Sequence, residues 1–309
     1  MKKLQDQLEE MGLKKQMEKR LRQDYMQALN DPDFRKMVDK VDAPDDLVMK
    51  FTSKLQDCVK DYKHCKNCKG LLSCKNQVTG YYLSPIHQNH LIEATYLPCR
   101  YQQRYLKDTA YQKNVHLYEV PLALKEASMK NIHIDGSNRV EVIKWMKQFL
   151  TNYPNDPHQK GLYLHGNFGC GKTYLISALF NKLAESGYRS AIVYYPEFLR
   201  SLKASFSNPE SDFETRFHFI KHVPLLLIDD IGAETTTPWS RDEILGSILQ
   251  YRMDQKLPTF FTSNISIKDI EGHFAVSKAS VETVKARRIV ERIKQLTVEM
   301  EMISQNKRG

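Results

Sequence analysis

An octapeptide in the middle of the chain restricts its fold more than any other feature of the sequence. It reads Gly166-Asn167-Phe168-Gly169-Cys170-Gly171-Lys172-Thr173 and matches G-x-x-x-x-G-K-[ST], the pattern of a phosphate-binding loop. The apolar segment 161–165 before it has the length of a buried strand, and apolar residues recur at helical spacing over 173–183 behind it. Strand, glycine loop and helix form the arrangement that this motif requires, so we predict an α/β nucleotide-binding fold.

The residue types of this loop fit a bound nucleoside triphosphate. Its glycines let successive backbone N–H groups turn toward an anion, and the following helix begins with a partial positive charge. Lys172 would reach the β- and γ-phosphates, and the Thr173 hydroxyl would ligate Mg²⁺. We therefore expect ATP and Mg²⁺ as cofactors, with the whole octapeptide around the phosphates.

Carboxylates follow a second apolar strand, predicted over 225–228. Asp229 is expected to hold the Mg²⁺ ion, and Asp230 to polarise the attacking water as a general base. We expect this strand next to the strand that precedes the phosphate-binding loop. Asn264 follows another predicted strand, 259–262, where its side chain would contact the γ-phosphate or position the water.

A basic helix is predicted near the end of the chain, over 284–293. Arg288 and Arg292 are four residues apart and therefore share one face. If copies of the protein assemble side by side, one of them, Arg292 in the first instance, would reach a neighbour's γ-phosphate as an arginine finger. A solvated face with Glu291 as local partner and a surface for DNA phosphates are the alternatives.

Clustered cysteines in the N-terminal half predict a metal site. Cys65 and Cys68 form a C-x-x-C pair, and a cytoplasmic protein is not expected to use such residues in disulfides. Tetrahedral Zn²⁺ prefers thiolate ligands, so we predict a structural zinc ion held by Cys65, Cys68, Cys74 and Cys99. The fourth ligand is the open choice, because His87 or His90 would replace Cys74 in a Cys₃His site.

The composition is that expected of a cytoplasmic protein with an anionic partner. The net charge is +9 and the pI is about 9.1, which favours nucleic acid as a partner, although ATP is itself an anion. No apolar run follows Lys2 and Lys3, so no signal peptide is expected, and Pro224 interrupts the most apolar stretch, 223–228. We expect no contact with a membrane.

Two domains joined by a linker are predicted. Residues 1–105 combine amphipathic helical stretches with the cysteine cluster, and we expect a small helical, zinc-binding domain there. Residues 106–135 are predicted to be a linker. Over 136–309, helices alternate with uninterrupted apolar strands, which is typical of a parallel sheet covered by helices on both faces.

The order of these motifs resembles AAA+ ATPases, particularly the clade of bacterial helicase loaders that includes the DnaC loaders and the IstB-type transposition ATPases. The residues that carry the resemblance are the phosphate-binding loop, Ile228-Asp229-Asp230-Ile231-Gly232, Thr262-Ser263-Asn264 and Arg287-Arg288-Ile289-Val290-Glu291-Arg292. Together with Cys65-Lys66-Asn67-Cys68 and Cys99, they resemble the primosomal DnaI family of Gram-positive bacteria.

This resemblance implies an AAA+ domain that binds ATP and single-stranded DNA, preceded by an N-terminal domain that binds zinc and the hexameric replicative helicase. Loaders and initiators share extra helical structure after the second strand that lines a DNA channel. The resemblance therefore implies that Lys203 meets a DNA phosphate and that Phe206 stacks on a base. Self-association on the helicase is implied if an arginine finger acts between copies.

The resemblance therefore implies an ATP-dependent loader of the replicative helicase onto single-stranded DNA, acting in primosome assembly and replication initiation or restart. Many AAA+ machines carry Glu where this chain has Asp230, and the shorter side chain predicts slow hydrolysis that suits a switch more than a motor. An IstB-like ATPase assisting a transposase and an adaptor that binds ATP without hydrolysing it are the alternatives.

Overall fold

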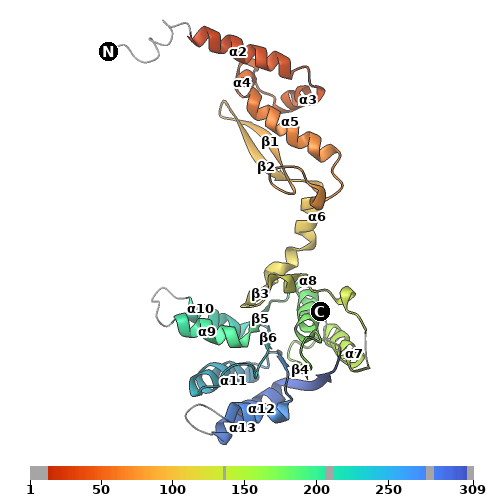
Figure 1. Cartoon of the computed structure of the whole chain (residues 1–309), viewed down its shortest axis with the longest axis vertical. Coiled ribbons are helices and arrows are strands. Elements are labelled where there is room, and N and C mark those ends of the chain that lie inside the picture. The colour runs from red at the N-terminus through yellow and green to blue at the C-terminus, as the bar shows by residue number, and fades with distance from the viewer. Residues whose placement is uncertain (1–12, 135–136, 206–211, 276–281, 305–309) are drawn as a thin grey trace, which may run out of the picture. The chain divides into compact units, whose positions relative to one another are not determined.

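The computed structural model describes residues 13–134, 137–205, 212–275 and 282–304, and the chain divides into two compact units, Met1–Thr109 and Ala110–Gly309 (Figure 1). Each unit has a hydrophobic core of its own. None of the described helices is both long and apolar enough to cross a membrane.

Helices build the first part of the N-terminal unit. They are α2 (Leu13–Ala28), α3 (Pro32–Val41), α4 (Asp45–Lys50) and α5 (Thr52–Lys66). Asp31 begins α3, because its carboxylate accepts a 3.0 Å hydrogen bond from the Asp33 N–H and Pro32 suits the first helical turn. The apolar faces of these helices bury Phe34 and Leu55 in one core, which stabilises segments too short to be helical alone.

A β-hairpin completes this unit, where the sequence predicts only a helical domain. Strands β1 (Tyr81–Gln88) and β2 (Leu91–Pro98) are antiparallel, and Gln88 lies opposite Leu91, so the loop is Asn89-His90. Both loop residues have positive φ, 52° and 59°, which matches the twist of a two-residue hairpin. The loop lacks the glycine that marks most such turns, so the residue pattern does not predict the hairpin. Helix α6 (Arg100–Asp108) follows it.

A six-stranded sheet with the order β3-β5-β6-β7-β4-β8 forms the centre of the second unit. Its strands are β3 (Val115–Tyr118), β4 (Gly161–Gly166), β5 (Ser190–Tyr194), β6 (Leu225–Asp229), β7 (Thr259–Ser263) and β8 (Thr297–Met302). Every pair of neighbouring strands is parallel, which confirms the predicted α/β fold with a parallel sheet.

Strand β7 lies between β6 and β4, so the strand that ends at Asp229 is not the direct neighbour of the strand before the phosphate-binding loop. The predicted neighbourhood was therefore wrong. A crossover connection can skip a position in a parallel sheet, and chain order alone does not fix which strand fills the gap. The carboxyl ends of all three strands nevertheless share one edge of the sheet, and Asp229, Asn264 and the loop after Gly166 meet there.

Helices cover both faces of the sheet. Helices α7 (Ser137–Asn152) and α8 (Lys172–Glu185) pack on one face. The other face carries α9 (Tyr195–Ser205), α10 (Phe213–His222), the π-helical turn η5 (Trp239–Leu245), α11 (Gly246–Asp254), α12 (Ile267–Ala275) and α13 (Thr283–Leu296). Successive strand residues point to opposite faces, so Leu227 joins the first core and Ile228 the second.

The segment predicted to be a linker, 106–135, differs from that expectation. Strand β3 pairs with β5 at the edge of the sheet, and the short 3₁₀ turns η2 (Ala110–Asn114), η3 (Leu122–Glu126) and η4 (Met129–Asn131) contact α8. Asn181 Nδ2 of α8 donates hydrogen bonds to Leu124 O at 2.9 Å and Ala127 O at 2.8 Å. These elements are too short to show a hydrophobic period, which is why the sequence pattern does not reveal them.

Candidate functional site

The phosphate-binding loop joins the end of β4 to the start of α8. Gly166, Gly169 and Gly171 have φ angles of 146°, 71° and 91°, in the region that favours glycine. A Cβ at Gly166 would lie 1.9 Å from Met302 O, so that position also has no room for a side chain. The loop conformation therefore depends on its glycines. Phe168 at its outer side is 73% exposed.

The Lys172 ammonium group lies inside this loop. Its Nζ donates to Gly166 O at 2.8 Å, to Asn167 O at 2.9 Å and to Asn264 Oδ1 at 2.9 Å. The loop and the end of β7 thus hold the ammonium group of Lys172 at the point where phosphate oxygens would enter. The predicted role of Asn264 next to the phosphates fits this position.

One oxygen of Asp229 joins three segments of the site. Its Oδ1 accepts hydrogen bonds from Thr173 Oγ1 at 2.7 Å and from Thr262 Oγ1 at 2.6 Å. Asp229 is 7% exposed, and burial raises its pKa, while the two hydroxyl donors partly offset that increase. A hydroxyl and a carboxylate in contact suit Mg²⁺, which takes one or two protein oxygens beside phosphate oxygens.

Asp230 and Asn264 form a second hydrogen-bonded pair in the site. Asp230 has a positive φ of 58°, and its N–H donates to Thr262 Oγ1 at 2.8 Å. Asn264 Nδ2 donates to Asp230 Oδ1 at 3.0 Å. Asn264 therefore links Asp230 to the ammonium group of Lys172 through two hydrogen bonds. The structure brings together the predicted residues Lys172, Thr173, Asp229, Asp230 and Asn264.

These residues line a cavity of about 750 Å³. The segment before α7, predicted to be a linker, also belongs to the site, because Val120, Pro121 and Leu124 form an apolar part of the cavity wall. Arg139 was not predicted either. It is a buried residue of α7 whose Nη1 donates to Cys170 O at 2.9 Å and so supports the loop from behind. A single arginine in a helix carries no motif, so no sequence signal identifies it.

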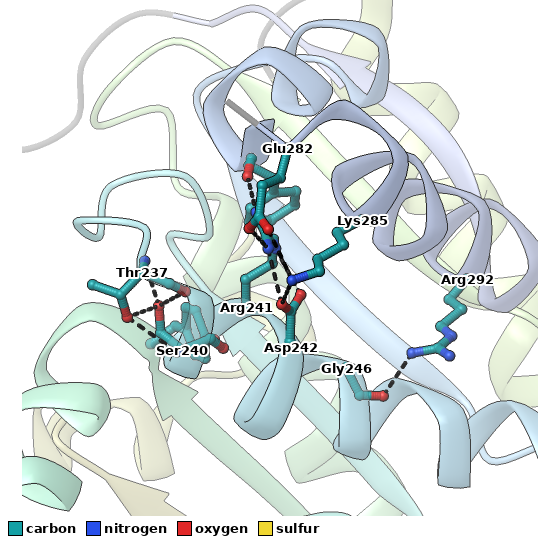
Figure 2. Close-up of polar contacts among 10 residues, drawn as sticks. Thr237, Ser240, Arg241, Asp242, Gly246, Glu282, Lys285 and Arg292 are labelled. Atoms are coloured by element: carbon teal, nitrogen blue, oxygen red, sulfur yellow. Dashed lines mark hydrogen bonds and ion pairs between the residues drawn. The ribbon is translucent and has the colours of Figure 1, made fainter. Parts of the chain in front are cut away.

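The arginines of α13 lie outside this cavity, as far as the described residues define it. Arg292 is half-buried, and its Nη1 donates to Gly246 O at 2.9 Å (Figure 2). The Arg288 side chain, one turn earlier, is exposed. Within one chain neither residue belongs to the nucleotide site, and an arginine-finger role therefore requires a second copy. This role stays a prediction.

The two predicted DNA contacts differ in what the structure describes. Lys203 lies on α9 with its Nζ 5.5 Å from the centroid of the Trp239 ring, a cation–π contact at the surface. Phe206 lies outside the described residues. Trp239 begins the π-helical turn η5 and is not among the residues predicted from the sequence.

The cysteines predicted to bind zinc gather at one place. Cys65, Cys68, Cys74 and Cys99 all line a cavity of about 550 Å³ beside β1. Gly80 N–H donates to Cys74 Sγ at 3.4 Å, and Asn76 Nδ2 donates to Cys65 Sγ at 3.4 Å. Nevertheless, in the described parts of the chain no three His, Cys, Asp or Glu side chains are grouped tightly enough to hold a metal ion.

The alternative histidine ligands lie elsewhere in the unit. His87 Nδ1 contacts Asp42 O at 3.1 Å, and His90 is exposed in the hairpin turn. Neither lines the cavity that the four cysteines share. Cys74 is therefore the better candidate for a fourth ligand, and burial raises the pKa of the neighbouring Cys65 thiol.

Comparison with known protein families matches both units. A family model described as the N-terminus of primosomal protein DnaI matches residues 1–96, and one described as the ATPase domain of bacterial DnaA matches residues 127–273. The second match agrees with the AAA+ ATPase-like fold, in which a parallel sheet presents the phosphate-binding loop at its carboxyl edge.

Individual relatives extend this similarity to nearly the whole chain. The replicative helicase loader DnaI of Bacillus subtilis is 34% identical over 294 residues, which is 94% of each protein. A crystal structure of DnaI matches with a TM-score of 0.56 and 37% identity over 64% of this chain and 99% of that chain. A crystal structure of a putative primosome component from Streptococcus pyogenes matches with a TM-score of 0.54 and 32% identity over 65% of this chain and 100% of that chain.

Proposed function

The chain belongs to the family of the replicative helicase loader DnaI, and we propose that it loads the hexameric replicative DNA helicase onto single-stranded DNA. It would do so with ATP during primosome assembly and replication initiation or restart. The similarity to DnaI over 94% of the chain carries this proposal, because it includes both the N-terminal unit and the ATPase unit.

The residues of the site fit ATP and Mg²⁺. Bound ATP would supply the phosphates, and Mg²⁺ would neutralise part of their charge. Thr173 and Asp229 would hold the ion, because their oxygens already meet at 2.7 Å. Lys172 would exchange its bonds to the loop carbonyls for phosphate oxygens, while Asn264 would keep both Lys172 and Asp230 oriented.

We infer that hydrolysis is slow. Asp230 accepts a hydrogen bond from Asn264 at 3.0 Å, so this amide holds the carboxylate that would take the proton from water. The aspartate is one methylene shorter than glutamate and reaches less far into the site. An arginine finger, Arg292 or Arg288, would complete the site from a neighbouring copy when several copies sit on the helicase.

We also propose the structural zinc ion. Four thiols facing one cavity supply the donor set that tetrahedral Zn²⁺ prefers, and the N–H donors of Gly80 and Asn76 to sulfur would stabilise thiolates. The ion would fix the start of β1 relative to the end of α5. In this proposal residues 1–105 form the helicase-binding domain, and Lys203 and Phe206 of the ATPase domain contact DNA.

Native mass spectrometry of the full chain with the replicative helicase of the same organism tests the loading function. We expect a helicase hexamer carrying several copies of this protein, and we expect the complex to disappear when residues 1–105 are deleted. Two separate species with and without ATP would contradict the proposal.

ATP hydrolysis separates the loader from the two alternatives. DNA-stimulated hydrolysis that Lys172→Ala abolishes would exclude a non-hydrolysing adaptor. DNA-dependent oligomers that form without any helicase would favour an IstB-like transposase helper.

A further inference from the structure

A buried arginine ties together three segments on the face of the sheet opposite the phosphate-binding helix α8. The Arg241 side chain has no exposed surface, and it bonds Asp242 through Nε at 2.7 Å and Nη2 at 2.9 Å. Its Nη1 donates to Phe274 O at 3.0 Å, and its Nη2 also pairs with Glu282 (Figure 2). One guanidinium group therefore joins η5, the end of α12 and the residue before α13.

Lys285 closes this group into a cluster of two cations and two anions. Its Nζ lies 2.8 Å from Glu282 Oε1 and 3.4 Å from Asp242 Oδ2. Glu282 is the N-cap residue of α13, and its N–H donates to Ala275 O at 2.8 Å. The cluster thus fixes the first turn of α13 against the end of α12. Charge-paired hydrogen bonds of this kind are the stronger ones, particularly when a guanidinium fork is involved.

The π-helical turn provides a second attachment for α13. Gly246 N–H donates to Arg241 O, the bond that widens η5 before α11 begins, and Gly246 O accepts from Arg292 Nη1 at 2.9 Å. A Cβ at Gly246 would lie 3.2 Å from Arg241 O and 3.5 Å from Arg292 Nη1, so the contact is close. Single π turns inside helices frequently mark functional sites.

Arg288 lies between these two attachments. The first holds α13 at Glu282 and Lys285, and the second holds it at Arg292 (Figure 2). Ala286 and Ile289 are buried and Arg288 is exposed, so Arg288 projects outward from a helix that is held at two points.

We propose that Arg241 is a positioning residue for ATP hydrolysis: it holds the first turn of α13 so that the arginines of this helix reach the nucleotide of a neighbouring copy. This inference rests on the proposed function, because it requires copies assembled on the helicase. Arg241 itself would touch neither ATP nor the attacking water. Its effect would pass through Glu282 to Arg288 and Arg292.

Substitution of Glu282 tests the inference with little risk to folding, because 26% of its side chain is exposed. We expect Glu282→Ala to bind ATP with the wild-type Kd as an isolated protein, but to lower the helicase-dependent turnover about 100-fold, the loss typical of a misplaced catalytic group. Glu282→Gln keeps an oxygen acceptor for Arg241 and should fall between the two. Glu185→Ala, which removes an exposed carboxylate paired with Lys182, is the matched control.

Mixing of subunits distinguishes a displaced α13 from a damaged nucleotide site. A Lys172→Ala copy lacks its own site but supplies an intact α13, whereas a Glu282→Ala copy supplies an intact site. We expect equal mixtures on the helicase to hydrolyse ATP faster than either variant alone. Wild-type turnover by Glu282→Ala, or no recovery on mixing, would overturn this inference alone. A wild-type protein no faster than Lys172→Ala would overturn the proposed function and this inference with it.

Discussion

The Thr173 hydroxyl donates a 2.7 Å hydrogen bond to Asp229 Oδ1 across a separation of 56 residues. Thr262 donates to the same oxygen at 2.6 Å from the neighbouring strand. The phosphate-binding loop, β6 and β7 therefore converge on one atom. This arrangement is preorganised for Mg²⁺, but it buries the carboxylate of Asp229. The burial of this group affects the free energy of unfolding.

We predict that Asp229→Asn raises the stability of the nucleotide-free protein at neutral pH. Burial raises the pKa of Asp229, so the folded chain binds its proton more tightly than the unfolded chain. The free energy of unfolding therefore falls as the pH rises through the native pKa of this group. Removal of the charge should raise the Tm by about 2–4 °C for each kcal/mol recovered. Thermal unfolding without nucleotide measures this change.

The same variant should lose the stabilisation that Mg²⁺ and ATP give to the wild type. The Tm of the wild type should rise on addition of Mg²⁺–ATP, whereas that of Asp229→Asn should stay nearly constant. Asp230→Asn is the matched control, because Asp230 is less buried and accepts its bond from Asn264 instead of a hydroxyl. A lower Tm for Asp229→Asn in the absence of nucleotide would show that burial of this charge is not costly.

Replacement of two different glycines by alanine should have opposite effects on stability. A Cβ at Gly161, at the start of β4, would lie 2.0 Å from Thr259 O on β7, and backbone cannot move aside. Gly161→Ala should therefore cost at least about 3 kcal/mol, the upper range for overpacking. Gly272 is exposed inside α12 with open space around it, so Gly272→Ala should stabilise by about 0.5–1 kcal/mol.

Denaturant unfolding of both variants checks these values. Equal effects of the two alanines would contradict the close approach of β4 and β7. The comparison needs no assumption about function, because neither glycine lies in the phosphate-binding loop.

Residues in contiguous motifs were predictable, and residues joined only by folding were not. The octapeptide and the carboxylates after β6 each identify their own chemistry, because the phosphate-binding loop and its metal ligand need fixed residue types at fixed spacings. Asn264 was predictable for the same reason, since it ends a strand of recognisable apolar pattern. The structure places Lys172, Asp229 and Asn264 within one hydrogen-bonded network, which runs through Thr262 and Asp230.

The local residue pattern does not predict Arg139, the order of the strands or the ionic cluster around Arg241. Arg139 acts through a hydrogen bond to Cys170 O that spans 31 residues, and Arg241 pairs with Glu282 across 41 residues. Hydrophobic period reports which side of an element is buried, but not which distant polar group it will meet. Such pairs depend on crossover connections whose positions in the sheet the sequence does not specify.

Arg252 provides a prediction about the core. It is fully buried, and no carboxylate of the described residues pairs with it. Its guanidinium donates to Val223 O at 2.7 Å, Pro258 O at 2.8 Å and Thr259 Oγ1 at 2.8 Å. Burial lowers the pKa of Arg252 to about 9. These bonds fix the turns that lead into β6 and β7. Arg252→Met should leave buried acceptors unpaired and cost about 3 kcal/mol.

Thermal unfolding should show the loss of stability in Arg252→Met as a lower Tm, by about 2–4 °C for each kcal/mol. Arg252→Lys keeps a charge but loses the planar fork, so it should also destabilise the protein, although less. At roughly 2–4 °C per kcal/mol, a Tm of Arg252→Met within about 1 °C of the wild-type value would contradict this prediction. It would show that the carbonyl groups find other donors.

The identity of the fourth zinc ligand gives the final prediction. Cys74 shares a cavity with Cys65, Cys68 and Cys99, whereas His90 is exposed in the hairpin turn. We expect one zinc ion per wild-type chain, and Cys74→Ser should lose it and unfold its N-terminal unit at lower temperature, because metal binding and folding are coupled. His90→Asn, which tolerates the positive φ of 59° at this position, should keep the ion.

Elemental analysis and the colorimetric release of zinc measure both variants. A full zinc content in Cys74→Ser together with loss in His90→Asn would instead assign a Cys₃His site, and a wild-type chain without zinc would contradict the metal site altogether.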